Sequence, residues 1–358
     1  MTERLISADS HVSIRHDQVK AHLPAKHHDA YDEAQSAFAE RMRKAMGAGS
    51  ANADAMKQNS HAAFTRAGYT DGSERLKDMD TDGVDAEVVY SEVSAFRYIG
   101  DMREGAGDAT RAFNDVMSDF ASADPKRLLV SYQIPIHDID CAVQEVRRVA
   151  AAGAKSLQLP VFPTEIGLPD YYDERYFPLW AAIQEVDLPI CCHIGLNTNL
   201  DDLTRRDPTP QKGVMVPMTA LSTAEAFGMW ILTGVLDRFP RLKLVFVEPG
   251  LGWVAWYLYI IDDMATRQGY TFPSIKEPLP STYFHRNMSL TFIDEPDALQ
   301  RLRDRIGVES ILWSTDYPHP VTSWPDSRAL IDRAFVGIPA DERELILSGN
   351  ATQVWNLS

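Results

Sequence analysis

Five polar residues of metal-binding type stand at the ends of short apolar runs. Asp9 and His11 occur in the segment ADSH, His193 in CCHIG, Glu248 in VEPG and Asp316 in WSTDYPH. Imidazole and carboxylate ligands together suit a divalent ion such as zinc, manganese or iron, whereas thiolates would suit a softer ion. These residue types therefore predict a site for one divalent metal ion with open positions for water or substrate.

The spacing of Asp9 and His11 indicates that both side chains leave the chain on the same side. In a β-strand, residues two apart share a face. Any one such acid or histidine is more often a helix cap, a surface charge or a hydrogen-bonded core group than a ligand. Their joint placement favours the metal site, because unpaired charges gathered in one buried place are costly unless an ion neutralises them.

The elements that would position these residues follow a regular alternation. Short runs rich in Val, Ile and Leu alternate with longer amphipathic stretches along the whole chain, which is typical of repeated βα units. Eight strands are the number that a (β/α)8 TIM barrel requires, and such barrels keep catalytic groups at the carboxyl ends of their strands. The predicted strands are Leu5–His11, Ala86–Ser91, Leu128–Ile134, Ser156–Pro160, Pro189–Ile194, Leu242–Glu248, Met288–Ile293 and Ile311–Asp316.

Helices are predicted between the strands from apolar residues at three- and four-residue spacing. Asp108 and Asp138 are expected to cap the first two of them. Gly83, Gly153 and Gly307 stand where helices should end in a left-handed residue. The predicted helices are Ala109–Ala123, Ile139–Ala152, Phe177–Val186, Ala224–Arg238, Pro296–Ile306 and Asp326–Phe335, with Ala340–Leu357 as a final helix that closes a rim of the barrel.

Two segments are longer than the minimal unit requires. Val12–Asp78 and Asn197–Met218 follow strands one and five, so both are expected as insertions that cap the carboxyl-terminal face of the barrel, although plain insertions or oligomer contacts are alternatives. Arg66 and Arg75, both in the first insertion, could each clamp a substrate carboxylate with two hydrogen bonds, but a surface ion pair is the more frequent outcome for such residues. No linker or repeat divides the chain, so residues 1–358 are expected to form one domain.

Composition excludes several classes of protein. The 358-residue chain has a formal net charge of −16, which disfavours nucleic acid as a partner. It has no apolar run of the roughly 18–20 residues needed to cross a bilayer and no signal-peptide pattern, so a soluble cytoplasmic protein without a membrane partner is expected. Three cysteines cannot make a disulfide framework. We expect small-molecule chemistry.

The same motifs also carry a resemblance to a known family. The chain resembles the amidohydrolase-related family, which includes aminocarboxymuconate-semialdehyde decarboxylase, γ-resorcylate decarboxylase and related hydrolases. The segments that carry it are the first-strand ADSH, the fifth-strand histidine, FPRLK before strand six, ILWSTDYPH in strand eight and GNA near the end. The strand-eight motif is the most specific of these, and the resemblance covers essentially the whole chain.

The resemblance implies roles for individual residues. One divalent ion would be bound by His11, His193 and Asp316. Asp9, which stands where a first-strand histidine is common, would be a further ligand of the same ion. Glu248 departs from the pattern, because many relatives have a histidine there. His319 and Trp253 are expected to shape the pocket or to orient ligands, and a plain core role is the alternative for Trp253. Relatives also imply a homodimer.

Two reactions fit these ligands. In hydrolysis of an ester, lactone, thioester or amide, the metal activates water and Asp316 accepts its proton, while Glu248 assists the leaving group. In decarboxylation of an aromatic or unsaturated acid, Asp316 delivers a proton to carbon before carbon dioxide leaves. We expect hydrolysis, with decarboxylation as the alternative, because an anionic Glu248 would not help to bind an anionic carboxylate. A binding protein on a degenerate barrel is disfavoured, since all the ligand positions hold competent donors.

Overall fold

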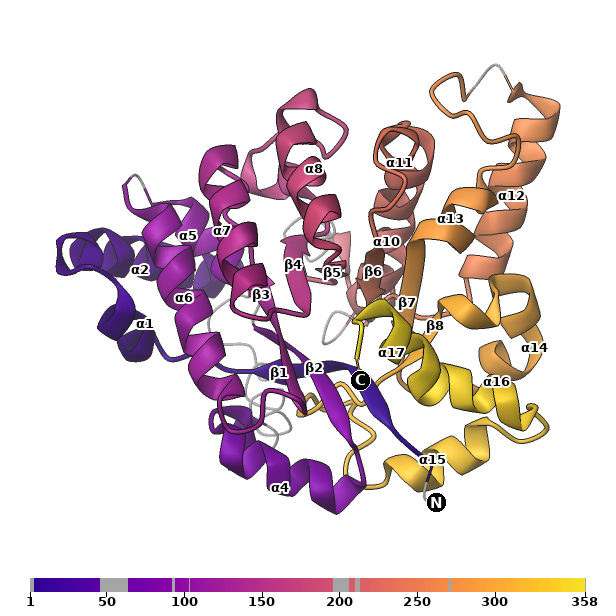
Figure 1. The fold of residues 1–358 in the computed structure, drawn as a ribbon, viewed down its shortest axis with the longest axis horizontal. Coiled ribbons are helices and arrows are strands. Elements are labelled where there is room, and N and C mark those ends of the chain that lie inside the picture. The colour runs from indigo at the N-terminus through magenta and orange to yellow at the C-terminus, as the bar shows by residue number, and fades with distance from the viewer. Residues whose placement is uncertain are drawn as a thin grey trace.

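The computed structural model of the chain describes residues 3–45, 64–91, 94–102, 104–195, 206–209, 213–269 and 272–357. Eight parallel strands lie side by side in the order in which they occur in the sequence, with helices outside them, so the predicted (β/α)8 barrel is confirmed (Figure 1). The ring closes where the backbone N–H of His11 donates to the carbonyl of Tyr317 (2.6 Å). The strands are β1 (Ile6–Val12), β2 (Ala86–Ser91), β3 (Leu128–Gln133), β4 (Ser156–Pro160), β5 (Ile190–His193), β6 (Leu244–Val247), β7 (Met288–Phe292) and β8 (Ile311–Trp313).

Helices surround the strands and cover their outer faces (Figure 1). None of the helices in the described ranges is long and apolar enough to cross a membrane. The α-helices are α1 (His16–His22), α2 (His28–Ala45), α4 (Gly72–Asp82), α5 (Ser94–Gly100), α6 (Ala106–Ala121), α7 (Ile139–Ala151), α8 (Phe177–Val186), α10 (Met215–Leu232), α11 (Val235–Arg238), α12 (Val254–Arg267), α13 (Ser281–Asn287), α14 (Pro296–Ile306), α15 (Ser327–Ala334), α16 (Ala340–Glu344) and α17 (Asn350–Val354).

The predicted helix ends are mostly confirmed. The side chain of Asp138 accepts a hydrogen bond from the backbone of Cys141 and caps α7, and Gly83 ends α4 with a left-handed φ of 73°. The predicted cap at Asp108 is wrong, because α6 already begins at Ala106 and Asp108 lies in its first turn. An acidic side chain in the first turn still interacts favourably with the helix dipole. For this reason an aspartate in the first turn, such as Asp108, is hard to tell from a cap residue in the sequence.

Two other predicted helices differ from the structure. The expected helix Ala224–Arg238 is two helices, since α10 begins at Met215 and Gly234, with φ 82°, separates it from α11. The expected tail helix Ala340–Leu357 contains a π-helical turn, Leu345–Gly349, between α16 and α17. Both differences involve helix geometry, and neither disturbs the order of the βα units.

The interior of the barrel is apolar at its amino-terminal end. Side chains from the starts of the strands, such as Ile6 and Ala86, pack with Ala351 and Trp355 of the C-terminal helical segment, and each of these side chains is no more than 2% exposed. This tail therefore closes the lower end of the barrel. The ionisable residues of the predicted site lie at the opposite end, where the strands finish.

The described part of the first insertion contains helices that the sequence did not predict. The described part of Val12–Asp78 contains α1, α2 and the first turns of α4. Phe64 and Arg66 lie against the loop after β8, where Phe64 contacts the ring of His319 (5.7 Å between centroids). Most of the predicted second insertion, Asn197–Met218, lies outside the described residues, and its end belongs to α10.

Candidate metal centre

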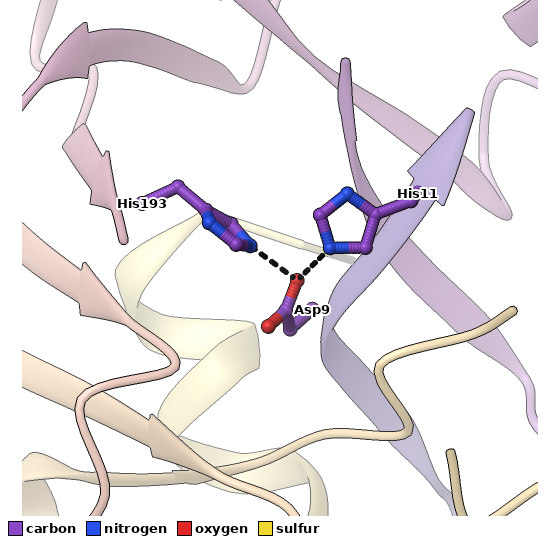
Figure 2. A group of neighbouring side chains, drawn as sticks. All are labelled: Asp9, His11 and His193. Carbon is purple, nitrogen blue, oxygen red and sulfur yellow. Dashed lines mark ion pairs between the residues drawn. The ribbon is translucent and has the colours of Figure 1, made fainter. Parts of the chain in front are cut away.

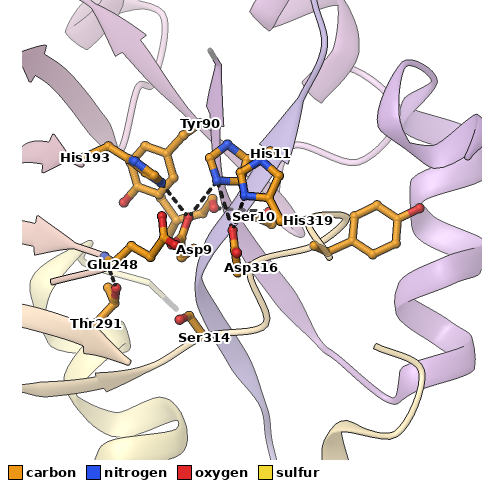
Figure 3. A network of polar contacts seen from close by, with 12 residues as sticks. Asp9, Ser10, His11, Tyr90, His193, Glu248, Thr291, Ser314, Asp316 and His319 are labelled. Atoms are coloured by element: carbon orange, nitrogen blue, oxygen red, sulfur yellow. Dashed lines mark hydrogen bonds and ion pairs between the residues drawn. The ribbon is translucent and has the colours of Figure 1, made fainter. Parts of the chain in front are cut away.

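The structure brings all five predicted site residues together at the carboxyl ends of β1, β5, β6 and β8 (Figure 3). His193 Nε2 lies 3.3 Å from Asp9 Oδ1, and His11 Nε2 lies 3.5 Å from the same oxygen (Figure 2). His11 Nε2 is also 3.1 Å from Asp316 Oδ1. Residues far apart in the sequence thus form one cluster inside the mouth of the barrel.

A bulge in β1 is what turns Asp9 and His11 inward. Between Ser7 and Ser10, β1 has one residue more than β2, because these two serines pair with positions 87 and 89. Ala8 already packs in the barrel interior, so strict alternation would turn Asp9 and His11 outward. The extra residue reverses the alternation and places the polar pair above the apolar layer.

Glu248 follows β6 directly, and Asp316 follows a short extension of β8. Both residues have unusual backbone conformations. Their φ angles are 62° and 52°, in the left-handed region that non-glycine residues seldom adopt. Such conformations persist where surrounding contacts hold them, and they are concentrated at functional sites. The backbone N–H of Asp316 donates to the carbonyl of Asp9 (3.0 Å), and that of Glu248 donates to Oγ1 of Thr291 (2.8 Å).

The cluster leaves an unusual number of buried polar atoms without a hydrogen bond. Both carboxylate oxygens of Asp9 and of Asp316, both ring nitrogens of His11, and Nε2 of His193 are buried with no hydrogen-bond partner. Each such atom ordinarily costs free energy. The ligand atoms of Asp9, His11 and His193 lie within 4.8 Å of one another, as do those of His11, Asp316 and His319. These residues fit a divalent cation, which would satisfy the unpaired atoms.

The two histidines differ in the environment of their rings. Burial lowers the pKa of His193, but the neighbouring Asp9 carboxylate outweighs it and raises the pKa to about 10. Its Nδ1 lies 2.9 Å from the carbonyl of Ile194, so the tautomer that donates there leaves Nε2 facing the cluster. Burial, with the charge of His319 as a further cause, lowers the pKa of His11 well below its usual value.

The two acids beside them are also different. Burial raises the pKa of Glu248 to about 8, and the negative charges of Asp316 and Asp9 add to this. Burial also acts to raise the pKa of Asp316, but contacts with His11 and His319 hold it well below the usual range. Glu248 therefore keeps a proton under conditions where Asp316 is ionised.

His319 lies against two residues of the cluster. Its ring stacks on His11 (3.9 Å between centroids), and its Nδ1 is 2.8 Å from Asp316 Oδ1. Trp253 lies apart from the cluster, where its indole N–H donates to the carbonyl of Pro249 (2.8 Å) and its ring packs on Phe227.

The two arginines of the first insertion have different environments. The guanidinium of Arg66 stacks on the ring of Trp324 (3.9 Å from Cζ to the centroid), and its Nε is buried without a partner. The surface ion pair expected for Arg75 is wrong, because Arg75 is fully buried and pairs with Glu87 (2.8 Å). Arg75 also donates to the carbonyl of His11 and so supports the site from behind.

Sequence reasoning missed two neighbours of the cluster. Thr291 is fully buried at the end of β7 and holds the backbone of Glu248. Tyr90, at the end of β2, is also fully buried, and its ring lies 5.5 Å from that of His193 between centroids. Neither residue type stands out in an apolar strand, so their only signal is their position one or two residues before a strand end.

Comparison with known proteins gives a consistent picture. The amidohydrolase family profile matches residues 20–357. The chain is 27% identical to γ-resorcylate decarboxylase from Rhizobium sp. over 68% of this chain and 76% of that protein. It is 22% identical to 2-amino-3-carboxymuconate-6-semialdehyde decarboxylase from Dictyostelium discoideum over 79% and 76%.

Solved structures share the fold. A 5-carboxyvanillate decarboxylase from Sphingomonas paucimobilis superposes with a TM-score of 0.74 at 22% identity, covering 100% of both chains. A dihydroxybenzoic acid decarboxylase from Polaromonas sp., solved with bound manganese and the inhibitor 2-nitroresorcinol, has a TM-score of 0.70 at 19% identity over 99% of this chain and 98% of that one.

The expectation of a hydrolase is overturned by the sequence matches, because both of these relatives are decarboxylases. That expectation assumed a permanently anionic Glu248, whereas burial raises the pKa of this residue to about 8. A protonated Glu248 does not repel a substrate carboxylate, so the argument against such a substrate does not hold.

Proposed function

The chain belongs to the amidohydrolase family, and from this premise we propose that it is a metal-dependent decarboxylase that removes carbon dioxide from an aromatic or unsaturated carboxylic acid. The observation that carries the proposal is the cluster of unpaired buried ligand atoms in Asp9, His11, His193 and Asp316. The chemistry of these ligand atoms suits a divalent ion, and the two sequence relatives described above are decarboxylases.

Asp9, His11, His193 and Asp316 would hold the ion. Manganese is the first choice, because the Polaromonas decarboxylase was solved with manganese, and zinc and iron suit the same donors. When bound, the ion would supply positive charge for the substrate carboxylate and an adjacent hydroxyl or keto group. His319, which stacks on His11 and contacts Asp316, would keep both ligands in place.

Glu248 is the residue to which we assign proton transfer. Decarboxylation breaks the bond between the carboxyl group and the substrate carbon that carries it. The electron pair of this bond stays on the substrate carbon, which must then gain a proton. Glu248 is held among other carboxylates, which favour its protonated form, whereas Asp316 is held ionised. This assignment moves proton delivery from Asp316, where the sequence placed it, to Glu248.

Arg66 would face the substrate from the first insertion. Its side chain is fixed on Trp324, and its Nε is buried without a partner, so it has a hydrogen bond to give to an anionic or carbonyl group. Trp253 supports the loop after β6 through its bond to Pro249 and has a structural role.

A homodimer that acts on small molecules in the cytoplasm completes the proposal. Trp256 and Tyr259 on α12 expose 62% and 63% of their surface, and exposed aromatic side chains are enriched at protein interfaces. The three cysteines are free, as expected in a reducing compartment. Sedimentation of the wild type against Trp256→Glu tests the dimer.

Elemental analysis followed by a substrate panel tests the function. Protein purified without chelator should contain close to one divalent ion per chain. It should decarboxylate members of a set of hydroxybenzoates while leaving matched esters, lactones and amides intact. Protein without stoichiometric metal, or turnover confined to the esters and amides, would contradict the proposal.

A further inference from the structure

The join between β1 and β8 separates two of the proposed metal ligands, His11 and Asp316. Every other pair of neighbouring strands shares a ladder of at least three residue pairs. Within the described residues, one isolated bridge, between Ser10 and Tyr317, joins β1 to β8. His11 Nε2 and Asp316 Oδ1 face each other at 3.1 Å across this join, which we call the seam (Figure 3). Few backbone contacts therefore hold the separation of these two ligands.

Arg75 of α4 contacts both sides of the seam. Its Nη2 donates to the backbone carbonyl of His11 and its Nη1 to Oγ of Ser10 (3.3 Å), both on β1. On the other side, its guanidinium lies on the ring of Tyr317, 4.2 Å from Cζ to the ring centroid, and Tyr317 directly follows Asp316. The Arg75 side chain is fully buried. One planar group thus links the backbone of one ligand to the neighbour of the other.

The same helix holds Tyr317 at a second point. Asp78 lies three residues after Arg75, on the same face of α4, and accepts a hydrogen bond from the hydroxyl of Tyr317. The carbonyl of Gly68 accepts a hydrogen bond from Arg75 Nε (2.8 Å). A Cβ at this glycine would lie only 2.5 Å from Asp78 Oδ2 and 2.9 Å from the Tyr317 hydroxyl, so the contact leaves no room for a side chain. These contacts fix the loop after β8 relative to β1.

Glu87 of β2 balances the charge of Arg75. Its carboxylate lies 2.8 Å from Arg75 Nη1, and both side chains are buried. A buried ion pair by itself adds little to stability, because the cost of desolvation offsets the attraction. The planar fork of an arginine can bond several acceptors at fixed angles, which a lysine cannot do. Arg75 bonds four acceptors, in Ser10, His11, Gly68 and Glu87, so its contacts indicate a role in geometry.

We propose, on the basis of the metal centre in the proposed function, that Arg75 is a positioning residue that sets the separation of His11 and Asp316 and thereby the affinity of the site for its divalent ion. The ion needs both ligands at fixed distances, and residues that orient metal ligands commonly contribute about tenfold to a hundredfold to metal affinity. Arg75 acts on these ligands through the backbone of His11 and the ring of Tyr317.

Arg75→Lys separates geometry from charge. Lysine keeps the positive charge beside Glu87 but cannot bond the carbonyls of His11 and Gly68 at the same time. We expect the dissociation constant for manganese, measured by calorimetry on protein freed of metal, to rise by about tenfold to a hundredfold. Cobalt(II) bound in place of manganese should show a changed visible spectrum, because its absorption depends on the arrangement of its ligands. Wild-type manganese affinity with an unchanged cobalt spectrum would overturn the proposal.

Glu87→Gln is the matched control for a purely structural role. It leaves the buried guanidinium without its counter-charge and should lower the melting temperature, yet it keeps the bond from Arg75 to His11. Its manganese affinity should stay within about threefold of the wild type. If manganese affinity fell in step with the melting temperature in both variants, Arg75 would act only through stability, and the proposal would be wrong.

A neutral double variant makes the same test without an unpaired buried charge. Arg75→Met combined with Glu87→Gln removes the guanidinium together with the charge that it balances, so the chain should still fold. The double variant should lose manganese affinity to the same extent as Arg75→Lys. Wild-type affinity in the double variant would contradict the proposal.

Metal binding is measured without turnover, so this proposal and the proposed function can fail separately. Weaker manganese binding in Arg75→Lys than in the wild type and Glu87→Gln, without release of carbon dioxide by any of them, would sink the decarboxylase and support the role of Arg75. Decarboxylation by the wild type with equal manganese affinity in all variants would do the reverse. Wild-type protein that binds no divalent metal would overturn both.

Discussion

Oγ1 of Thr291 accepts a hydrogen bond from the backbone N–H of Glu248 at 2.8 Å. This bond joins the end of β7 to a residue whose φ is 62°, a conformation that needs support from its surroundings. The same backbone conformation directs the Glu248 side chain toward Asp9 and Asp316. Thr291 therefore sets the position of the group to which we assign proton transfer.

Replacing Thr291 by valine, which has the same shape but no acceptor, should lower kcat by about tenfold, because the Glu248 backbone loses its partner. Metal content should change little, and the melting temperature should fall by a few degrees, because the buried N–H of Glu248 is left without an acceptor. Thr291→Ser restores the hydroxyl and should recover most of the activity. A valine variant with wild-type kcat would show that the bond does not position Glu248.

Glu248→Gln should keep the metal and lose at least about a hundredfold in kcat, because glutamine cannot transfer a proton. Because the reaction needs protonated Glu248, kcat/KM of the wild type should fall as the pH rises past the pKa of this residue, which is about 8 in the metal-free structure. This fall of kcat/KM at high pH should be absent in Glu248→Gln. The exposed Glu185→Gln serves as control. Loss of metal would instead make Glu248 a ligand, and unchanged kinetics would exclude both roles.

His193→Ala should abolish turnover and metal retention while the barrel stays folded, because it removes the only ligand from β5 and leaves apolar packing intact. Circular dichroism and elemental analysis measure the two effects. His22→Ala, which removes a partly exposed histidine paired with Asp119, should retain metal and activity. Activity in His193→Ala would place the site elsewhere.

Metal binding should release a proton from His193. In the metal-free site its pKa is raised to about 10, so at neutral pH the ion must displace a proton, and affinity should rise up to about tenfold per pH unit until pH approaches 10. His11, whose pKa is lowered, is already neutral and adds no such dependence. Calorimetry in buffers of different ionisation enthalpy counts the protons released on binding. His193 remains charged over roughly pH 6 to 9, so a metal affinity that does not change with pH in this range would contradict the prediction.

The barrel was predictable because strand runs such as Ser156–Pro160 and helix ends such as Gly83 obey local rules. The site residues were predictable because they are polar and end apolar runs. The bulge before Ser10 was not, since one extra residue in β1 is visible only against its partner strand. The left-handed backbone of Glu248 and its tie to Thr291 depend on contacts between strands, which no local pattern encodes.

The reaction could not be predicted from the sequence for a related physical reason. The charge of Glu248 was read from its residue type, whereas its pKa depends on burial beside Asp316 and Asp9. Burial of that kind follows from the closed ring of eight strands and is not apparent in the sequence around Glu248.

Release of labelled carbon dioxide is the most direct test of the central claim. Manganese-loaded protein would be incubated with 2-hydroxybenzoates labelled with ¹³C in the carboxyl group, beside chelator-treated protein and the Asp316→Asn variant. We predict metal-dependent release of ¹³C-labelled carbon dioxide together with the matching phenol, and none from either control. No labelled carbon dioxide from any of these acids, with metal-dependent cleavage of esters or amides in its place, would contradict the account.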